Sequence, residues 1–215
     1  MSEIDINKQD ENGNTFFHLN RKAAPFWELA QNDEHPKVII KNNKGETIFH
    51  INPCFYIPEK YPNVDFNTLL DNEGNTIVHS FVKSLRAKLA RIEDNYDYYY
   101  RCMSINYKFK YICENTNIDL NIRNNDGETF FDIVLKDRLG TDIINDILEP
   151  ALKKGFNPIY YNKKGYMIFH DPWVRENHLK LFNQYGYDIT SITDPDGKTV
   201  NEYIKWSMDN YDDYY

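Results

Sequence analysis

Histidine and cysteine are the side chains of this chain best suited to chemistry, because both bind metal ions and both act in catalysis. Four of the six histidines stand at the same place in a recurring nine-residue motif, namely His18, His50, His79 and His170. Zinc holds each imidazole nitrogen at about 2 Å, whereas equivalent residues of stacked helical units lie roughly 8–10 Å apart. We therefore expect these histidines to be structural and predict no metal site.

The three cysteines, Cys54, Cys102 and Cys113, are odd in number and have neither metal-binding nor redox spacing. Cys102 and Cys113 fall near an apolar stripe, which favours packing in the core. His35 and His178 are isolated in the sequence, and nothing near them marks either as a general base. Free thiols indicate a reducing compartment, so we predict an intracellular, cytoplasmic protein.

A phosphate-binding loop is suggested by Gly197-Lys198-Thr199, which has the residues that end such a loop. The loop also needs a glycine five residues before Gly197, where Ile192 stands. Because Gly197 belongs to the recurring motif, its presence needs no phosphate to explain it. We predict no cofactor and no enzyme activity, since an enzyme would need a spatial cluster of Cys or Asp and His that the sequence does not indicate.

The elements that position these residues follow from the motif itself, Asp/Asn-x-x-Gly-x-Thr-x-x-His. It occurs six times, starting at Asp10, Asn42, Asp71, Asn124, Asn162 and Asp194. All copies keep the glycine, but Met167 replaces one threonine, and Asp132 and Glu202 replace two histidines. A period of about 20–50 residues is typical of stacked-repeat proteins, in which each unit buries its apolar face against its neighbours. We number the six copies units 1 to 6.

Each unit is expected to form a hairpin turn, a helix, a loop and a second helix. The Asx residues and the glycine favour a turn, and the threonine suits a helix N-terminus, where its oxygen can accept a backbone N–H. A short Asp-x-Asn marker precedes several copies, as at Asp5–Asn7, Asp65–Asn67 and Asp119–Asn121. Weaker versions are Asn157–Ile159 and Asp188–Thr190.

The motif resembles the ankyrin repeat, whose hallmark is Gly-x-Thr-Pro-Leu-His-x-Ala after a β-turn. Matching stretches include Thr15–His18, Thr47–His50 and Thr76–His79, although the proline is missing from every copy. The resemblance implies an all-α ankyrin-repeat solenoid of about six helix–loop–helix units with short β-hairpin fingers. It also implies a single domain over residues 1–215, with units that start near residues 10, 42, 71, 124, 162 and 194.

Proline interrupts two of the units. Pro53, Pro58 and Pro62 predict short or distorted helices in unit 2, because an interior proline removes a hydrogen bond and clashes with the preceding turn. Pro172 predicts the same directly after His170.

Unit 3 carries an insert at about residues 90–112. We predict a lengthened first helix over about 76–92, a tyrosine-rich loop that includes 94–100, and a lengthened second helix over about 100–114. Unit 4 is predicted to be lengthened through residues 142–154. Such insertions often mark a binding face, and the alternative is drift at a tolerant surface.

Hairpin tips and first helices carry partner specificity in ankyrin repeats, so the resemblance implies a protein–protein interaction module that binds through the tips and the concave helical face. Aromatic and arginine side chains at the tips are the expected anchors. The predicted partner-binding residues are Leu69, Leu70, Arg123, Tyr160, Tyr161 and Tyr166. The alternative is that the apolar tips pack against an adjacent finger.

The formal net charge of −8 argues against nucleic acid as a partner, which requires a basic face, and favours a neutral or basic protein. The sequence shows no signal-peptide pattern and no apolar run long enough to span a membrane. The chain is similar to divergent, Asn-rich ankyrin proteins of large DNA viruses and intracellular bacteria, which implies the host cytoplasm as its location. A self-associating structural or assembly component is the alternative function.

Overall fold

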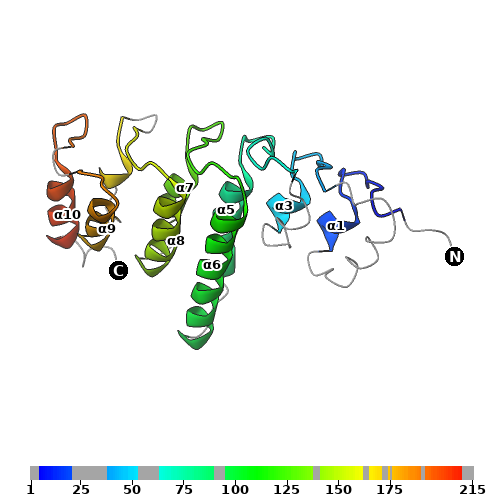
Figure 1. Cartoon of the computed structure of the whole chain (residues 1–215), viewed down its shortest axis with the longest axis horizontal. Coiled ribbons are helices and arrows are strands. Elements are labelled where there is room, and N and C mark those ends of the chain that lie inside the picture. The colour runs from blue at the N-terminus through cyan, green and yellow to red at the C-terminus, as the bar shows by residue number, and fades with distance from the viewer. Residues whose placement is uncertain are drawn as a thin grey trace.

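The computed structural model describes residues 5–20, 38–52, 63–89, 95–137, 141–161, 165–170, 174, 176–189 and 192–209. Its helices stand side by side along one long row, and the turns that join the units project along one edge of that row (Figure 1). The two chain termini lie toward opposite ends of the row. The arrangement is that of a solenoid, in which each unit contacts only its neighbours.

Helices make up nearly all of the regular structure in the described segments. In chain order they are α1 (Phe16–Leu19), α3 (Ile48–Ile51), α5 (Ile77–Leu89), α6 (Asn95–Asn115), α7 (Phe130–Lys136), α8 (Thr141–Lys154), the 3₁₀ turn η1 (Ile168–His170), α9 (Glu176–Gln184) and α10 (Val200–Asp209). Isolated antiparallel bridges join Tyr161 to Met167 and Thr193 to Thr199. None of the helices described is both long and apolar enough to cross a membrane.

The motif threonine directly precedes the first helix of its unit. Thr15, Thr47 and Thr129 have extended backbones, with φ of −85°, −89° and −80°, and α1, α3 and α7 begin at the next residue. This change of backbone brings the cap side chain close to the N–H groups of the first helical turn. In unit 5, Met167 takes the place of the threonine, and only the three-residue turn η1 follows.

Phenylalanine rings connect the units through the core. Phe81 in α5, Phe109 in α6, Phe130 in α7 and Phe156 after α8 are almost completely buried. The ring centroids are 6.1 Å apart from Phe81 to Phe109, 5.5 Å from Phe109 to Phe130 and 5.1 Å from Phe130 to Phe156. Because these spacings suit favourable aromatic contacts, units 3 and 4 share one continuous core.

The insert of unit 3 is a helix where the sequence predicted a loop. Helix α6 spans Asn95–Asn115 without a break, so the prediction of a tyrosine-rich loop at 94–100 is wrong from its second residue onward. The stretch holds no glycine or proline that would interrupt a helix. Packing of the buried Ile105 and Phe109 holds the C-terminal half, and the helix propagates from there. Residues 90–94 lie outside the described segments.

The other irregular helices follow the sequence more closely. Helix α3 ends at Ile51, and the residue that precedes Pro53 disfavours a helical backbone. The short first helix predicted for unit 2 is thus confirmed, while Pro53, Pro58 and Pro62 themselves lie outside the described residues. Helix α8 covers the lengthening predicted over 142–154.

The motif glycine adopts a backbone conformation that other residues avoid. Gly74 has a φ of 76° and Gly197 a φ of 82°, both in the left-handed region. The turn of unit 4 lies directly over Gly74, where an added Cβ would stand 2.9 Å from the backbone nitrogen of Asn125. Within 4 Å of a Cβ added to Gly197 there is no atom of the described residues.

Replacing the glycine with alanine is therefore expected to cost more stability at Gly74 than at Gly197. Both substitutions place an L side chain in the left-handed region, which costs about 1–2 kcal/mol. Gly74→Ala also forces two stacked turns apart, which adds roughly 1–3 kcal/mol. Urea unfolding followed by circular dichroism measures both losses, and equal values would contradict the stacking of the turns.

Candidate functional site

Each motif histidine joins its own threonine to the next unit. The backbone N–H of Thr15 donates to Nδ1 of His18 over 3.1 Å, and the Thr15 hydroxyl lies 2.8 Å from the same nitrogen. Because Nδ1 accepts, the hydrogen of the neutral ring sits on Nε2. Nε2 then donates to the backbone carbonyl of Glu46 in unit 2, at 3.0 Å.

The same link recurs along the row. His50 in unit 2 contacts the carbonyl of Asn75 at 3.1 Å, and His79 in unit 3 contacts that of Glu128 at 3.1 Å. All three acceptors are the residue that follows the motif glycine of the next unit. The structural role that we predicted for these histidines is confirmed, since each side chain spends both ring nitrogens on hydrogen bonds inside the chain.

Burial disfavours the charged form of His50 and His79. It is the main cause that lowers the pKa of His50, although the Asn75 carbonyl and the charges of Asp71 and Glu46 oppose the shift. Burial also lowers the pKa of His79 to about 4, against the opposing hydrogen bond to Glu128. The neutral ring is the form that the network needs, because a proton on Nδ1 would abolish the bond from the threonine N–H.

Unit 4 ends its motif with Asp132 in place of histidine and makes a different link. One carboxylate oxygen of Asp132 accepts from both the N–H and the hydroxyl of Thr129, each at 2.8 Å. A carboxylate has no proton to donate onward, and Tyr160 supplies it: the Tyr160 hydroxyl lies 2.6 Å from the same oxygen and 2.7 Å from the Thr129 hydroxyl. Burial, followed by the charge of Asp132, raises the pKa of Tyr160, so its hydroxyl stays protonated.

Residues that directly precede the motif form a further set of links between units. Gln9 donates to the carbonyl of Lys41 at 3.0 Å, and Lys41 donates to that of Leu70 at 2.7 Å. Arg123 donates to the carbonyl of Tyr161 at 3.2 Å, and its guanidinium lies 4.6 Å from the centre of the Tyr160 ring. Arg123, which was predicted to contact a partner, therefore also holds neighbouring turns in register.

The predicted partner-binding residues lie in two places. Leu69 belongs to the core and is 6% exposed, which argues against a contact with a partner, and Leu70 beside it is half-buried. Arg123, Tyr160 and Tyr161 come together where the chain enters unit 5, and of these Tyr161 is the most accessible aromatic, at 53% exposed.

Tyr166 stands apart from both groups. Its ring centroid is 6.5 Å from that of His170, and its hydroxyl donates a hydrogen bond to Asp196 in unit 6. A role in binding a partner stays a prediction for Leu70, Arg123, Tyr161 and Tyr166.

A groove that the sequence did not indicate crosses units 1 to 3. It has a volume of about 960 Å³ and is lined by the turns of these units, by the ends of α1 and α3, and by one face of α5. We call it the inner groove. The lining includes the exposed Leu19 and Lys44, the half-buried Ser80, and Lys83, whose ammonium lies 2.8 Å from the carboxylate of Glu73. The helical spacing of Ser80, Lys83 and Ser84 was the available signal for this face.

A second, smaller groove of about 480 Å³ lies between the second helices α6 and α8. Its polar groups are paired with one another: Asn106 donates to Asp146 at 2.9 Å, and Lys153 lies 2.9 Å from Glu149. Cys113 lies at its base and is buried, which raises the pKa of the thiol to about 12. The thiol is therefore the unreactive, protonated form that we predicted for a cysteine packed in the core.

Comparison with known proteins identifies the fold. No family model matches the sequence, and no curated protein does. Among solved structures the chain is similar to EF0377, an ankyrin repeat protein, with a TM-score of 0.60 and 17% sequence identity, covering 89% of this chain and 89% of that one. It is also similar to the ankyrin repeat domain of Bcl-3, a member of the IkappaB protein family, with a TM-score of 0.43, 15% identity, and coverage of 94% and 100%. The chain has the all-α ankyrin-repeat fold that the motif predicted.

Replacing His79 with a residue that does not titrate is expected to make the free energy of unfolding depend less on pH. The unfolded chain binds this proton with the ordinary pKa of 6.5 and the folded chain with a pKa of about 4, so folding is favoured fully above pH 6.5 and progressively less as the pH falls toward 4. The total change is on the order of 3 kcal/mol. His79→Gln keeps a donor and an acceptor but does not titrate. Urea unfolding at pH 7.5, 5.5 and 4.5 should show a smaller loss in the variant, and an identical pH slope would refute the argument.

Tyr160 and its neighbour Tyr161 offer a matched pair for the link between units 4 and 5. Tyr160→Phe removes a hydrogen bond to a carboxylate and should destabilise the protein by roughly 1.5–3 kcal/mol. Tyr161→Phe alters an exposed side chain and should change the free energy of unfolding by less than about 0.5 kcal/mol. Thermal unfolding compares the two, and similar losses would show that the buried hydroxyl adds no stability.

Proposed function

We propose that this chain is a protein-interaction module whose partner occupies the inner groove and touches the turn tips. The observation that carries the proposal is the groove itself, because three successive units build it jointly and it has the size of a binding site rather than of a packing defect. Groups of both charge signs and an exposed leucine line it, which suits a folded protein or a peptide segment. The net charge of −8 favours a neutral or basic partner.

The turn tips supply the second part of the proposed interface. Ile159 and Tyr161 are 40% and 53% exposed and lie two residues apart in the segment that leads into unit 5. Arg123 lies beside them through its hydrogen bond to the Tyr161 carbonyl. Tyrosine and arginine are the residues that most often anchor protein interfaces, so we propose Leu70, Arg123, Tyr161 and Tyr166 as tip contacts.

Binding is favoured over catalysis by the way the reactive residues are used. His18, His50 and His79 would suit acid–base chemistry, but their ring nitrogens form hydrogen bonds to their own threonine and to the next unit. We propose that the protein is not an enzyme and that it works inside cells, in the cytoplasm. A viral or effector origin, with the host cytoplasm as the location, remains part of this proposal.

Self-association is the second candidate, and one observation favours it. Tyr107 on α6 is 71% exposed and stacks on Tyr111 with their ring centroids 6.5 Å apart. A lateral contact through α6 would cover these rings. Light scattering at two protein concentrations separates a monomer from an assembly.

Quantitative mass spectrometry of proteins captured on the full chain tests the interface. Leu19→Ala with Ser80→Tyr removes the exposed leucine of the inner groove and places a bulky ring there, Leu70→Ala with Tyr161→Ala removes tip anchors, and Tyr107→Ala on α6 serves as the control. A partner of the inner groove should be depleted at least about 5-fold by the first pair and unaffected by the control, because anchor residues contribute more than about 1 kcal/mol. If no protein is enriched, or if only Tyr107→Ala depletes it, the inner groove is not the interface.

A further inference from the structure

Ladders of hydrogen bonds run from unit to unit, and the first involves the marker asparagines. The side-chain oxygen of Asn67, ahead of unit 3, accepts from the backbone N–H of Asp119 at 2.6 Å. That of Asn121, ahead of unit 4, accepts from the backbone N–H of Asn157 at 2.7 Å, and its amide donates to a neighbouring carbonyl at 3.2 Å. At these two junctions one asparagine side chain ties the backbone of a unit to that of the next, whereas Ile39 stands in the equivalent position ahead of unit 2.

A second ladder joins the turns themselves through the residue after the first motif position. The backbone N–H of Asn72 donates to the carbonyl of Lys44 at 3.0 Å, and that of Asn125 donates to the carbonyl of Glu73 at 2.9 Å. Their side-chain amides add bonds to the carbonyls of Asn43 at 2.9 Å and Asn72 at 3.1 Å. The motif histidines provide the third ladder.

At the junction of units 5 and 6, the groups that make the first two ladders are missing from the sequence. Ile159 stands where Asn67 and Asn121 stand in earlier markers and has no amide. Pro195 occupies the second motif position of unit 6 and has no N–H to donate. Neither loss depends on the position of any neighbouring atom.

The histidine link is missing at the same junction. His170 is 4% exposed and its Nδ1 accepts from the N–H of Met167 at 3.2 Å, but its buried Nε2 has no acceptor of good geometry among the described residues. Burial lowers the pKa of His170, whereas the charge of Asp194 and the backbone of Ile192 oppose this shift. A buried donor left unpaired weakens the contact that buries it.

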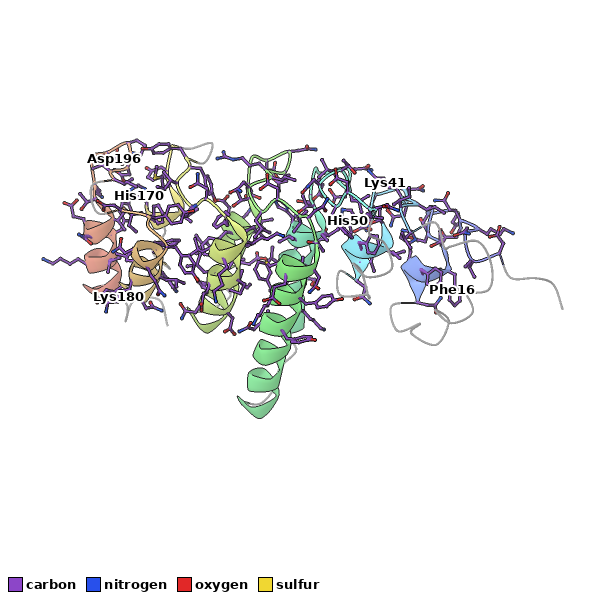
Figure 2. The ribbon with its side chains drawn as sticks, in the orientation of Figure 1. Phe16, Lys41, His50, His170, Lys180 and Asp196 are labelled. Carbon is purple, nitrogen blue, oxygen red and sulfur yellow. The ribbon has the colours of Figure 1, made fainter. Side chains whose placement is uncertain are left out.

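Contacts of another kind hold unit 6 in place. Figure 2 shows His170 just below the turn that carries Asp196, and that carboxylate accepts from the Tyr166 hydroxyl. The ring centroids of His170 and Tyr203 lie 5.2 Å apart, and Val200 is buried. The one side-chain hydrogen bond of this set, Tyr166 to Asp196, lies at the surface, where water competes with it.

We infer that residues 192–209 form a separate cooperative unit that opens while the preceding units stay folded. In a linear stack, stability is the sum of unit terms and neighbour terms, so a junction that lacks groups linking the other units opens first. The opening uncovers the face of unit 5 that carries His170, whose ring centroid lies 5.2 Å from that of Tyr203, and Tyr166 lies at the edge of that face. This hinged unit is independent of the partner proposed for the inner groove.

Native-state hydrogen exchange of the full chain tests the inference. The amides of α10 should exchange at least about 10-fold faster than those of α5, α7 and α8, in a step that exposes little surface to denaturant. If the most protected amides of α10 exchange at the same rate as those of α5 and α7, the protein opens only as a whole and the inference is wrong.

Two variants are expected to change the hydrogen-exchange protection of α10 in opposite directions. Ile159→Asn with Pro195→Asn restores the missing groups, and each new hydrogen bond should raise the protection of α10 by about 2- to 10-fold. Asn121→Ile removes the equivalent group one unit earlier and should lower the protection of α9 and α10 together, with α5 unchanged. The matched control is Ile39→Asn, an exposed isoleucine in the equivalent position ahead of unit 2, which should leave α10 unaffected. Equal effects of the control and the restoring variant on α10 would overturn the inference.

Discussion

A buried hydrogen-bond donor that finds its acceptor only on the next unit is the constraint on which this structure depends. His18, His50 and His79 each bury an imidazole whose Nε2 reaches a backbone carbonyl of the following unit. Leaving such a donor unpaired costs about 1–3 kcal/mol. The hydrogen bonds of a single unit are therefore satisfied only when its neighbour folds against it. The distance that the histidine side chain spans to the next carbonyl helps to set the regular spacing of the stack.

The exceptions obey the same constraint by other means. Asp132 has no proton to donate, so Tyr160 supplies one from the next segment, and the link between units 4 and 5 survives with its direction reversed. Glu202, at the same position of unit 6, likewise accepts the N–H and the hydroxyl of its own Thr199. At His170 the buried Nε2 has no hydrogen-bond partner among the described residues, which is the basis for the separate opening that we infer for residues 192–209.

Hydrogen bonds within the chain also determine which side chains can contact a partner. Gln9, Lys41 and Arg123 occupy tip positions, yet each donates to the tip of the next unit. A partner would therefore meet the turns as a prearranged surface, with few side chains to order on binding. The proposed contacts lie at the exposed Leu19 and Lys44 of the inner groove and at the exposed Ile159 and Tyr161.

The sequence by itself determined the all-α ankyrin-repeat fold and the structural role of His18, His50 and His79, because turn glycines, cap threonines and their spacing act locally. The prediction from the sequence was wrong at residues 95–100. Their tyrosines and acidic residues suggested a loop, but no glycine or proline interrupts the helix there. The sequence also ranked Leu69 and Tyr160 as contacts for a partner, although one is in the core and the other bonds to Asp132. Only the tertiary structure could decide these points, together with the inner groove, because they depend on which side chains of neighbouring units meet. A motif fixes the conformation within one unit, whereas the pairing of donors and acceptors between units is settled only when the units stack.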